Sequence, residues 1–176
     1  MDKKLINPRF LAVTCMVLFA AALRLVPHYP NFTPVAAMAL FGGAYFSNKK
    51  LAFMVPLAAM FISDLILGFH STMWAVYLSF AAVVVIGLSL RKSKKISNIF
   101  LAVISSSVLF FIVTNFAVWM MGTMYPMTLS GLAESYVAAI PFFSYSVLGD
   151  LFYAGIFFGA FEFAKIKFPV LAKAEV

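Results

Sequence analysis

The sequence predicts an all-α integral membrane protein with six transmembrane helices and both termini in the cytoplasm. Hydrophobic residues make up 64% of the chain and charged residues only 11%, whereas a soluble domain of this length carries about 25% charged residues to cover its surface. The hydrophobic residues fall in six runs. If each run crosses the membrane, the basic residues lie almost entirely on one side of it. This charge bias is typical of cytoplasmic loops, so we interpret the net charge of +7 as a sign of membrane topology and expect no nucleic-acid binding.

The first three runs cover residues 10–26, 34–46 and 51–68. The first one resembles a signal peptide, but five further runs follow it, so we interpret it as a retained span. A straight span needs about 20 residues, and about 17 at least. The second run is shorter than this, so it either crosses a thinned region or turns back as a re-entrant segment buried in protein. The third run contains Pro56, which is expected to kink the helix.

The last three runs cover residues 73–90, 96–120 and 138–164. An outer loop over residues 122–134 precedes the sixth run, in which Pro141 predicts a second kink. We expect one transmembrane domain over residues 1–176, because no loop is long enough for a soluble catalytic module. The chain also contains no G-x-x-x-x-G-K-[ST] sequence, so it does not carry an ATPase of its own.

The basic residues favour six crossings over a re-entrant second run. If all six runs cross, every Lys and Arg residue except Arg24 falls on the side of the termini, which is then the inner side of a bacterial cytoplasmic (inner) membrane. A re-entrant second run would move some of these residues outside and invert every later loop. The residues on the predicted inner side are Lys3, Lys4, Arg9, Lys49, Lys50, Arg91, Lys92, Lys94, Lys95, Lys165, Lys167 and Lys173.

Two oppositely charged residues are expected at a similar depth in the outer leaflet. Counted from Leu51, Asp64 lies about 20 Å along its helix, and Arg24 lies one turn from the outer end of the first run. Charges in hydrocarbon are retained when they are paired, hydrated or functional. We therefore expect a structural Arg24–Asp64 ion pair, although Arg24 has the alternative of reaching the outer headgroups with its long side chain.

Asp150 lies near the middle of the sixth run, where its short side chain cannot reach the headgroups. It must face the interior of the bundle, together with Ser146 and Tyr153 on the same helical face. Such a group of polar side chains lines a ligand pocket or an ion path. The alternative is that Asp150 forms a buried hydrogen bond between helices and binds no ligand.

The outer ends of the fifth and sixth runs collect aromatic and amide side chains, which predict a ligand cavity beneath the outer loops. Asn115 and Trp119 are one turn apart in the fifth run, although Trp119 also fits an ordinary interfacial aromatic belt. Aromatic walls with a few polar groups are typical of sites for flat organic ligands. The candidate ligand-binding residues are Asn31, Asp64, His70, Asn115, Trp119, Tyr125, Tyr145 and Asp150.

Small residues in the second run predict a close helix–helix contact. Ala39, Gly43 and Ser47 are spaced by four and form a ridge that meets another span or a partner subunit. The single cysteine, Cys15, is expected to be a small buried hydrophobe. No Cys/His spacing suggests a metal, and we expect no cofactor.

Several motifs resemble those of an uncharacterised family of small bacterial membrane proteins. They are P-H-x-P-N-F-T-P-V-A-A-M-A-L-F-G-G at residues 27–43, Ser63-Asp64, T-N-F-x-V-W at residues 114–119, Tyr125-Pro126 and Gly149-Asp150. The likeness covers roughly residues 20–163. Members of that family are labelled as substrate-binding S components of energy-coupling-factor (ECF) vitamin transporters.

This resemblance implies six helices with both termini inside and a vitamin bound near the outer face by outer loops and the last three helices. It also implies docking on a transmembrane coupling protein driven by two ATPases. Cobalamin or a related corrinoid is the first substrate to consider. One departure concerns the docking ridge, because the first run lacks the A-x-x-x-A pattern typical of S components. Either the second run supplies that ridge, or the protein acts alone.

Two other classes of function remain as alternatives. The chain could be a membrane scaffold without a ligand, or an intramembrane aspartyl protease in which Asp64 and Asp150 share a proton. The protease reading lacks the Tyr that precedes one aspartate and the first Gly that precedes the other in such enzymes. We therefore expect a binding protein and no enzymatic activity.

Overall fold

The computed structural model describes residues 7–172, which form six α-helices and a short 3-10 helix. Three of the helices, α3, α5 and α6, are long and apolar enough to cross a membrane, and the other three are apolar but shorter. The elements are α1 (Pro8–Leu23), α2 (Val35–Tyr45), α3 (Lys49–Leu67), α4 (Met73–Ser89), α5 (Ile96–Met121), α6 (Leu129–Lys167) and η1 (Pro169–Leu171).

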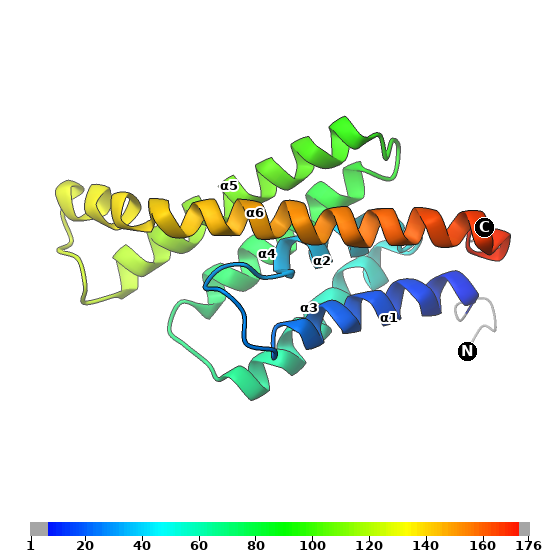
Figure 1. Cartoon of the computed structure of the whole chain (residues 1–176). Helices are drawn as coiled ribbons and strands as arrows, with labels where there is room; N and C mark the ends of the chain where they lie inside the picture. The colour runs from blue at the N-terminus through cyan, green and yellow to red at the C-terminus, as the bar shows by residue number, and fades with distance from the viewer. Residues whose placement is uncertain (1–6, 173–176) are drawn as a thin grey trace.

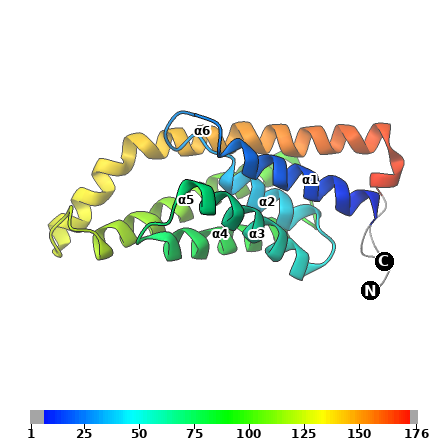
Figure 2. The same cartoon turned by 90° about the horizontal axis from the view of Figure 1, so that it is seen from below.

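The helices run back and forth along one bundle axis (Figure 1). The first turn of α1 and η1 lie side by side at one end, which we call the termini end. The opposite end, called the far end below, carries the α1–α2, α3–α4 and α5–α6 loops, and α5 and α6 extend there beyond the other helices (Figure 2). Lys3, Lys4 and Lys173, which belong to the predicted inner side, lie outside the described residues.

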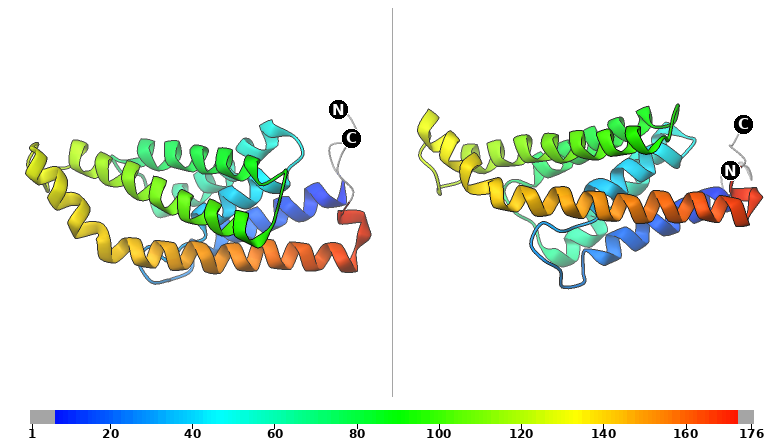
Figure 3. Two further views of the ribbon diagram at one scale, coloured as in Figure 1. Left: turned by 90° about the horizontal axis from the view of Figure 1, so that it is seen from above. Right: turned by 45° about the horizontal axis from the view of Figure 1, so that its top comes forward.

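The short helix α2 is the centre of the bundle and contacts each of the other five α-helices (Figure 3). Every residue from Ala36 to Tyr45 is buried. With 11 residues the helix is about 16 Å long, roughly half of the hydrocarbon thickness of a bilayer. Because α2 has no exposed side, it cannot offer a docking surface to a partner, and this excludes it as the replacement ridge considered above.

Glycines allow α2 to approach its neighbours closely. A Cβ on Gly43 would lie 2.5 Å from the carbonyl oxygen of Val84 and 2.8 Å from the Cα of Gly87, both in α4. The predicted ridge of small residues therefore packs within the chain over Ala39 and Gly43. Its third member, Ser47, is exposed and follows the end of α2, because the helix stops at Tyr45.

Charged side chains from other elements cap both ends of α2. At its N-terminus the backbone N–H of Ala36 donates to the Asp150 carboxylate of α6. At its C-terminus the Arg91 guanidinium donates to the carbonyl oxygens of Gly43 (3.0 Å) and Phe46. A negative charge at the N-terminus and a positive charge at the C-terminus both stabilise the helix dipole. A short buried helix thus obtains the partners that its free N–H and C=O groups require.

Helix α6 begins much earlier than predicted. It is one 39-residue helix, so the second half of the loop predicted at residues 122–134 is helical. The Thr128 side chain accepts a hydrogen bond from Gly131 N at 3.1 Å and caps the new first turn. The part of α6 that contains Pro141 is bent (Figure 2), as expected where a proline removes a backbone hydrogen bond.

The outer surface of the bundle is largely apolar, as lipid contact requires. Side chains such as Phe19, Ile66 and Phe152 are more than half exposed. Cys15 also lies on the exposed surface, so the prediction that it is buried was wrong. The reason is that the buried stripe of α1 runs through Val13 and Val17, and Cys15 points away from that stripe.

Candidate functional site

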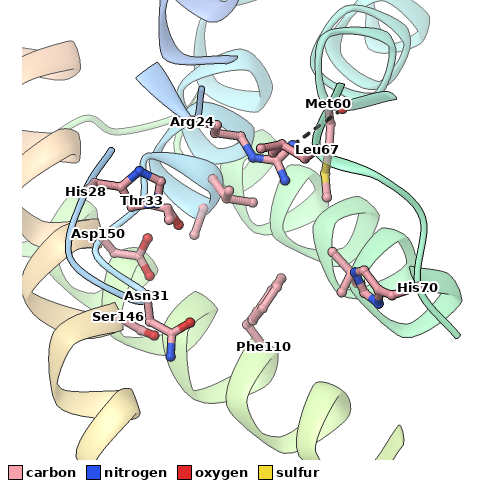
Figure 4. Close-up of a pocket in the computed structure, with 13 residues that line it drawn as sticks. Arg24, His28, Asn31, Thr33, Met60, Leu67, His70, Phe110, Ser146 and Asp150 are labelled. Carbon is pink, nitrogen blue, oxygen red and sulfur yellow. Dashed lines mark hydrogen bonds between the residues drawn. The ribbon is translucent and has the colours of Figure 1, made fainter. Parts of the chain in front are cut away.

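Two adjoining cavities open at the far end, where the α1–α2 loop lies between α3, α5 and α6. The larger has a volume of about 350 Å³ and the smaller about 210 Å³. Four residues line both of them: Asn31, Phe110, Ser146 and Asp150. Figure 4 shows Asp150, Asn31 and Ser146 gathered on one side of the larger cavity, with Arg24 across from them and Phe110 rising from α5.

Asp150 is buried at the junction of the two cavities. Its Oδ2 accepts a hydrogen bond from the Ser107 hydroxyl of α5 at 2.7 Å, and it also faces the Ala36 N–H of α2. Only 7% of the residue is exposed. Among residues 7–172 it takes part in no salt bridge. The carboxylate therefore joins three helices through neutral hydrogen-bond donors and has no basic partner.

The α1–α2 loop reaches the cavities because it packs tightly on α6. A Cβ on Gly149 would lie 3.0 Å from the Cα of Phe32, so the glycine permits this contact. The preceding residue, Asn31, has a positive φ of 64°, a conformation that asparagine adopts more readily than most residues. This turn places Asn31 on the wall of both cavities.

The wall opposite Asp150 is held by the Arg24–Asp64 ion pair. Arg24 Nη2 lies 2.8 Å from Asp64 Oδ1, with the side chains 13% and 6% exposed. Arg24 Nη1 donates to Ser63 Oγ at 2.5 Å and to the Met60 carbonyl oxygen at 3.4 Å. Tyr77 of α4 donates its hydroxyl to the second carboxylate oxygen at 2.8 Å. The pair ties α1, α3 and α4 together, and its charges compensate each other.

Aromatic rings form much of the smaller cavity. Phe110 and Phe111 of α5 face Phe142 and Phe143 of α6, and the rings of Phe111 and Phe143 lie 4.7 Å apart. Asn115 lines the same cavity, and its amide nitrogen donates to the Phe111 carbonyl oxygen at 2.8 Å. The amide oxygen of Asn115 and the second N–H of its amide nitrogen remain for a ligand.

The predicted ligand-binding residues divide into two groups. Asn31, His70, Asn115 and Asp150 line the cavities, and Asp64 lies behind them as the partner of Arg24. Three aromatic residues line neither cavity: Trp119 donates its indole N–H to the Pro126 carbonyl oxygen at 3.0 Å, Tyr145 pairs with Tyr29 at a ring distance of 4.5 Å, and Tyr125 lies in the α5–α6 loop.

Sequence reasoning missed several residues of the site. Ser107 belongs to three consecutive serines in an apolar helix, and Tyr77 is the single tyrosine of α4. Both are polar groups at membrane depth, which is the signal that singled out the aspartates. His28 also lines the larger cavity, on the opposite side from His70 (Figure 4). Within residues 7–172, no three His, Cys, Asp or Glu side chains gather as metal ligands.

Comparison with known proteins places the chain in one group of sequences. Residues 4–171 match the model of a family described as a family of unknown function (DUF6580). No curated protein and no solved structure matches the chain significantly.

Proposed function

The chain belongs to this family of unknown function, and we propose that it is a solute-binding membrane protein similar to an ECF S component. In this proposal the ligand is a small, flat, positively charged micronutrient. It occupies the two cavities at the far end, and Asp150 is its counter-ion.

The lack of a basic partner for the buried Asp150 side chain is the observation that carries the proposal. The carboxylate lines both cavities, is buried, and forms its hydrogen bonds with neutral groups. Arg24 does not neutralise it, because Asp64 already binds that guanidinium. A buried carboxylate without a basic partner is costly unless a cation or a proton joins it. A positively charged ligand supplies that cation.

The walls support a flat ligand of modest size. Four phenylalanine rings line the smaller cavity, and aromatic faces attract cations and stack on planar rings. The larger cavity, at about 350 Å³, lies near the lower end of the range of about 300–1,000 Å³ for ligand sites. A corrinoid is much larger than the ligands of such cavities, so a smaller vitamin fits the site better than cobalamin does.

The proposed topology has six crossings, with the termini end in the cytoplasm and the cavities open to the outside. Helix α2 crosses as a short helix inside protein, where Asp150 and Arg91 satisfy its ends. Reporters fused after Lys50 and after Lys95 should report the cytoplasm, and a reporter within residues 122–127 should report the exterior. An exterior signal after Lys50 would contradict six crossings.

Uptake by such a protein needs energy from a separate protein. The sequence contains no nucleotide-binding motif, so the S-component reading includes a separate transmembrane coupling protein and ATPases. Because α2 is buried, a coupling protein would bind another helix.

A scaffold without a ligand is the second candidate, supported by the hydrogen bonds that Asp150 makes between three helices. The protease reading has less support. Asp64 and Asp150 bind different partners, and within residues 7–172 no hydrogen bond joins the two carboxylates.

The test is ligand binding by purified protein. Native mass spectrometry should detect a co-purified small molecule, and calorimetry should show binding of thiamine, a cation with two planar aromatic rings, in preference to the anionic vitamin folate. Asp150→Asn keeps the size of the side chain and an acceptor for Ser107 but removes the charge. It should weaken cation binding by about 2–5 kcal/mol, the usual cost of losing one partner of a buried charge pair.

Glu162→Gln is the matched control, because it removes a carboxylate of the same helix at the termini end, away from the cavities. It should leave ligand affinity unchanged. If Asp150→Asn retains full affinity, or if the wild-type protein binds no cation and carries no solute, the proposal is wrong and the scaffold reading replaces it.

A further inference from the structure

An apolar groove lies on the outside of the bundle, between α5 and α6 toward the termini end. Its volume is about 470 Å³, and its walls are formed by Ile99, Phe100 and Val103 of α5 and Leu151, Ala154 and Phe158 of α6. Lys94 and Glu162 are the charged residues that line it. The groove is separate from the cavities described above, since the residues that line it are different.

Two glycines deepen this groove. A Cβ on Gly155 or Gly159 would have no atom of another side chain or element within 4 Å, so neither glycine serves a close contact within the chain. Glycine inside a helix costs about 1 kcal/mol relative to alanine. In this bundle the other helical glycines each have a close neighbour: Gly43 and Gly87 meet each other's backbone, and Gly42 meets the Pro56 ring. The space next to Gly155 and Gly159 is therefore not filled by the chain itself and can accept a bound molecule.

The length of the groove matches one leaflet of a bilayer. Along α6 it extends from Leu151 to Glu162, a helical distance of about 16 Å. The hydrocarbon core of a bilayer is about 30 Å thick, so one leaflet contributes about half of this. The charged residues occupy the end of the groove at which the headgroups of that leaflet would lie.

That end of the groove is positively charged. Lys94 Nζ, Lys165 Nζ and the Arg9 guanidinium lie 5.1, 6.0 and 6.0 Å from the centre of the Tyr45 ring. The carboxylate among them, Glu162, is already bound by Lys165 at 2.6 Å and by the Tyr45 hydroxyl at 2.5 Å. Three cations thus share one carboxylate.

Lys94 has donors to spare for an anion. Its hydrogen-bond acceptor in the described chain is the Arg91 carbonyl oxygen, at a long distance of 3.5 Å. An ammonium group can donate three hydrogen bonds. Burial, together with repulsion from Arg9 and Lys165, lowers the pKa of Lys94, and an anion beside it would oppose this effect.

We propose that the groove is a binding site for an anionic phospholipid of the leaflet at the termini end. One acyl chain lies between α5 and α6 over Gly155 and Gly159, and the phosphate binds Lys94. Charge complementarity favours an anionic lipid over a zwitterionic one, and over a purely apolar partner helix, which would bring no charge for Lys94. This site goes beyond the proposed solute binding and does not depend on it.

Native mass spectrometry of the delipidated protein tests the proposal, with phosphatidylglycerol and phosphatidylcholine added in separate experiments. The wild-type protein should retain phosphatidylglycerol in preference to phosphatidylcholine. Lys94→Gln should weaken phosphatidylglycerol binding about fivefold, the factor expected for one lysine at an anionic surface. Gly159→Leu should fill the groove and remove the bound lipid.

Two matched variants control for general effects. Lys49→Gln removes an exposed lysine of α3, which does not line the groove, and Ala160→Leu enlarges an exposed residue of α6 that faces away from it. Both should bind phosphatidylglycerol as the wild type does. A cooperative unfolding transition should show that every variant is folded. Added phosphatidylglycerol should then raise the Tm of the control variants but not that of Gly159→Leu. Equal retention of the two lipids by the wild type, or undiminished binding in Gly159→Leu, would overturn the proposal.

Discussion

The Arg24–Asp64 pair gives the sharpest test of the fold. Leucine replaces Arg24 and Asp64 singly and together, because leucine is apolar and similar in length to the aspartate. Each single variant leaves one buried charge. Without Asp64, the guanidinium retains Ser63 and the Met60 carbonyl oxygen. Without Arg24, the carboxylate retains one hydrogen-bond donor among residues 7–172, the Tyr77 hydroxyl.

The expected magnitudes follow from this geometry. Removing one partner of a buried pair costs about 3–5 kcal/mol, and we expect the lower half of this range because each charge keeps a hydrogen bond. The double variant leaves no buried charge. Its loss of unfolding free energy should therefore be much smaller than the sum of the losses of the two single variants. We therefore expect a coupling energy near the upper end of the usual 0.5–3 kcal/mol range for contacting residues.

The assay is reversible unfolding by sodium dodecyl sulfate in mixed micelles, followed by circular dichroism and evaluated as a double-mutant cycle. The Glu162–Lys165 pair is the internal control, because its N–O distance is similar, 2.6 Å, but its side chains are 45% and 25% exposed. Exposed pairs contribute about 0–1 kcal/mol. Additive losses for Arg24 and Asp64, within about 0.5 kcal/mol, would show that the pair does not hold the helices together.

Three further outcomes are expected. Gly43→Ala should lower the unfolding free energy in the same assay by about 1–3 kcal/mol, because its Cβ would lie 2.5 Å from a carbonyl oxygen. Gly155→Ala has open space and should raise the unfolding free energy by up to about 1 kcal/mol, since alanine favours the helix more than glycine does. Arg91→Gln should lower the unfolding free energy by about 1.5–3 kcal/mol for each charged hydrogen bond lost. An unchanged unfolding free energy would mean that α2 needs no C-terminal cap. In calorimetry, Asn115→Leu should weaken ligand binding by about 1–3 kcal/mol, while Trp119→Ala, which lines neither cavity, should not; the reverse order would place the ligand elsewhere.

The positions of the helices could be predicted from the sequence more easily than the way they pack. Hydropathy located all six helices, since apolar runs in lipid are read directly from composition. It missed the first turns of α6, because residues 129–137 are less apolar and the cap by Thr128 is a local signal. It could not show that α2 is central, although the 11-residue length and the adjacent glycines Gly42 and Gly43 agree with burial in protein.

The site was predictable in its charges but not in its contacts. Arg24, Asp64 and Asp150 stand out in any apolar sequence, because each charge at membrane depth needs a partner. Helical periodicity shows which residues share a face of one helix, but not which helix that face meets, so Ser107 and Tyr77 were missed. Trp119 was expected to line the ligand cavity together with Asn115, but it lines neither cavity, and its N–H binds the Pro126 carbonyl oxygen of the following loop.

The position of Asp150 at the N-terminus of α2 explains how a buried carboxylate without a basic partner is stabilised. A helix N-terminus carries about half a positive elementary charge, and Asp150 faces it through the Ala36 N–H. The dipole therefore balances about half of the carboxylate charge, and the rest remains for a ligand. If a lysine or arginine paired with Asp150, the site would have no charge left to attract a cation. Without α2, the buried carboxylate would take up a proton or distort the bundle. A short helix with both ends inside the protein is thus the feature that makes a cation site at this depth physically reasonable.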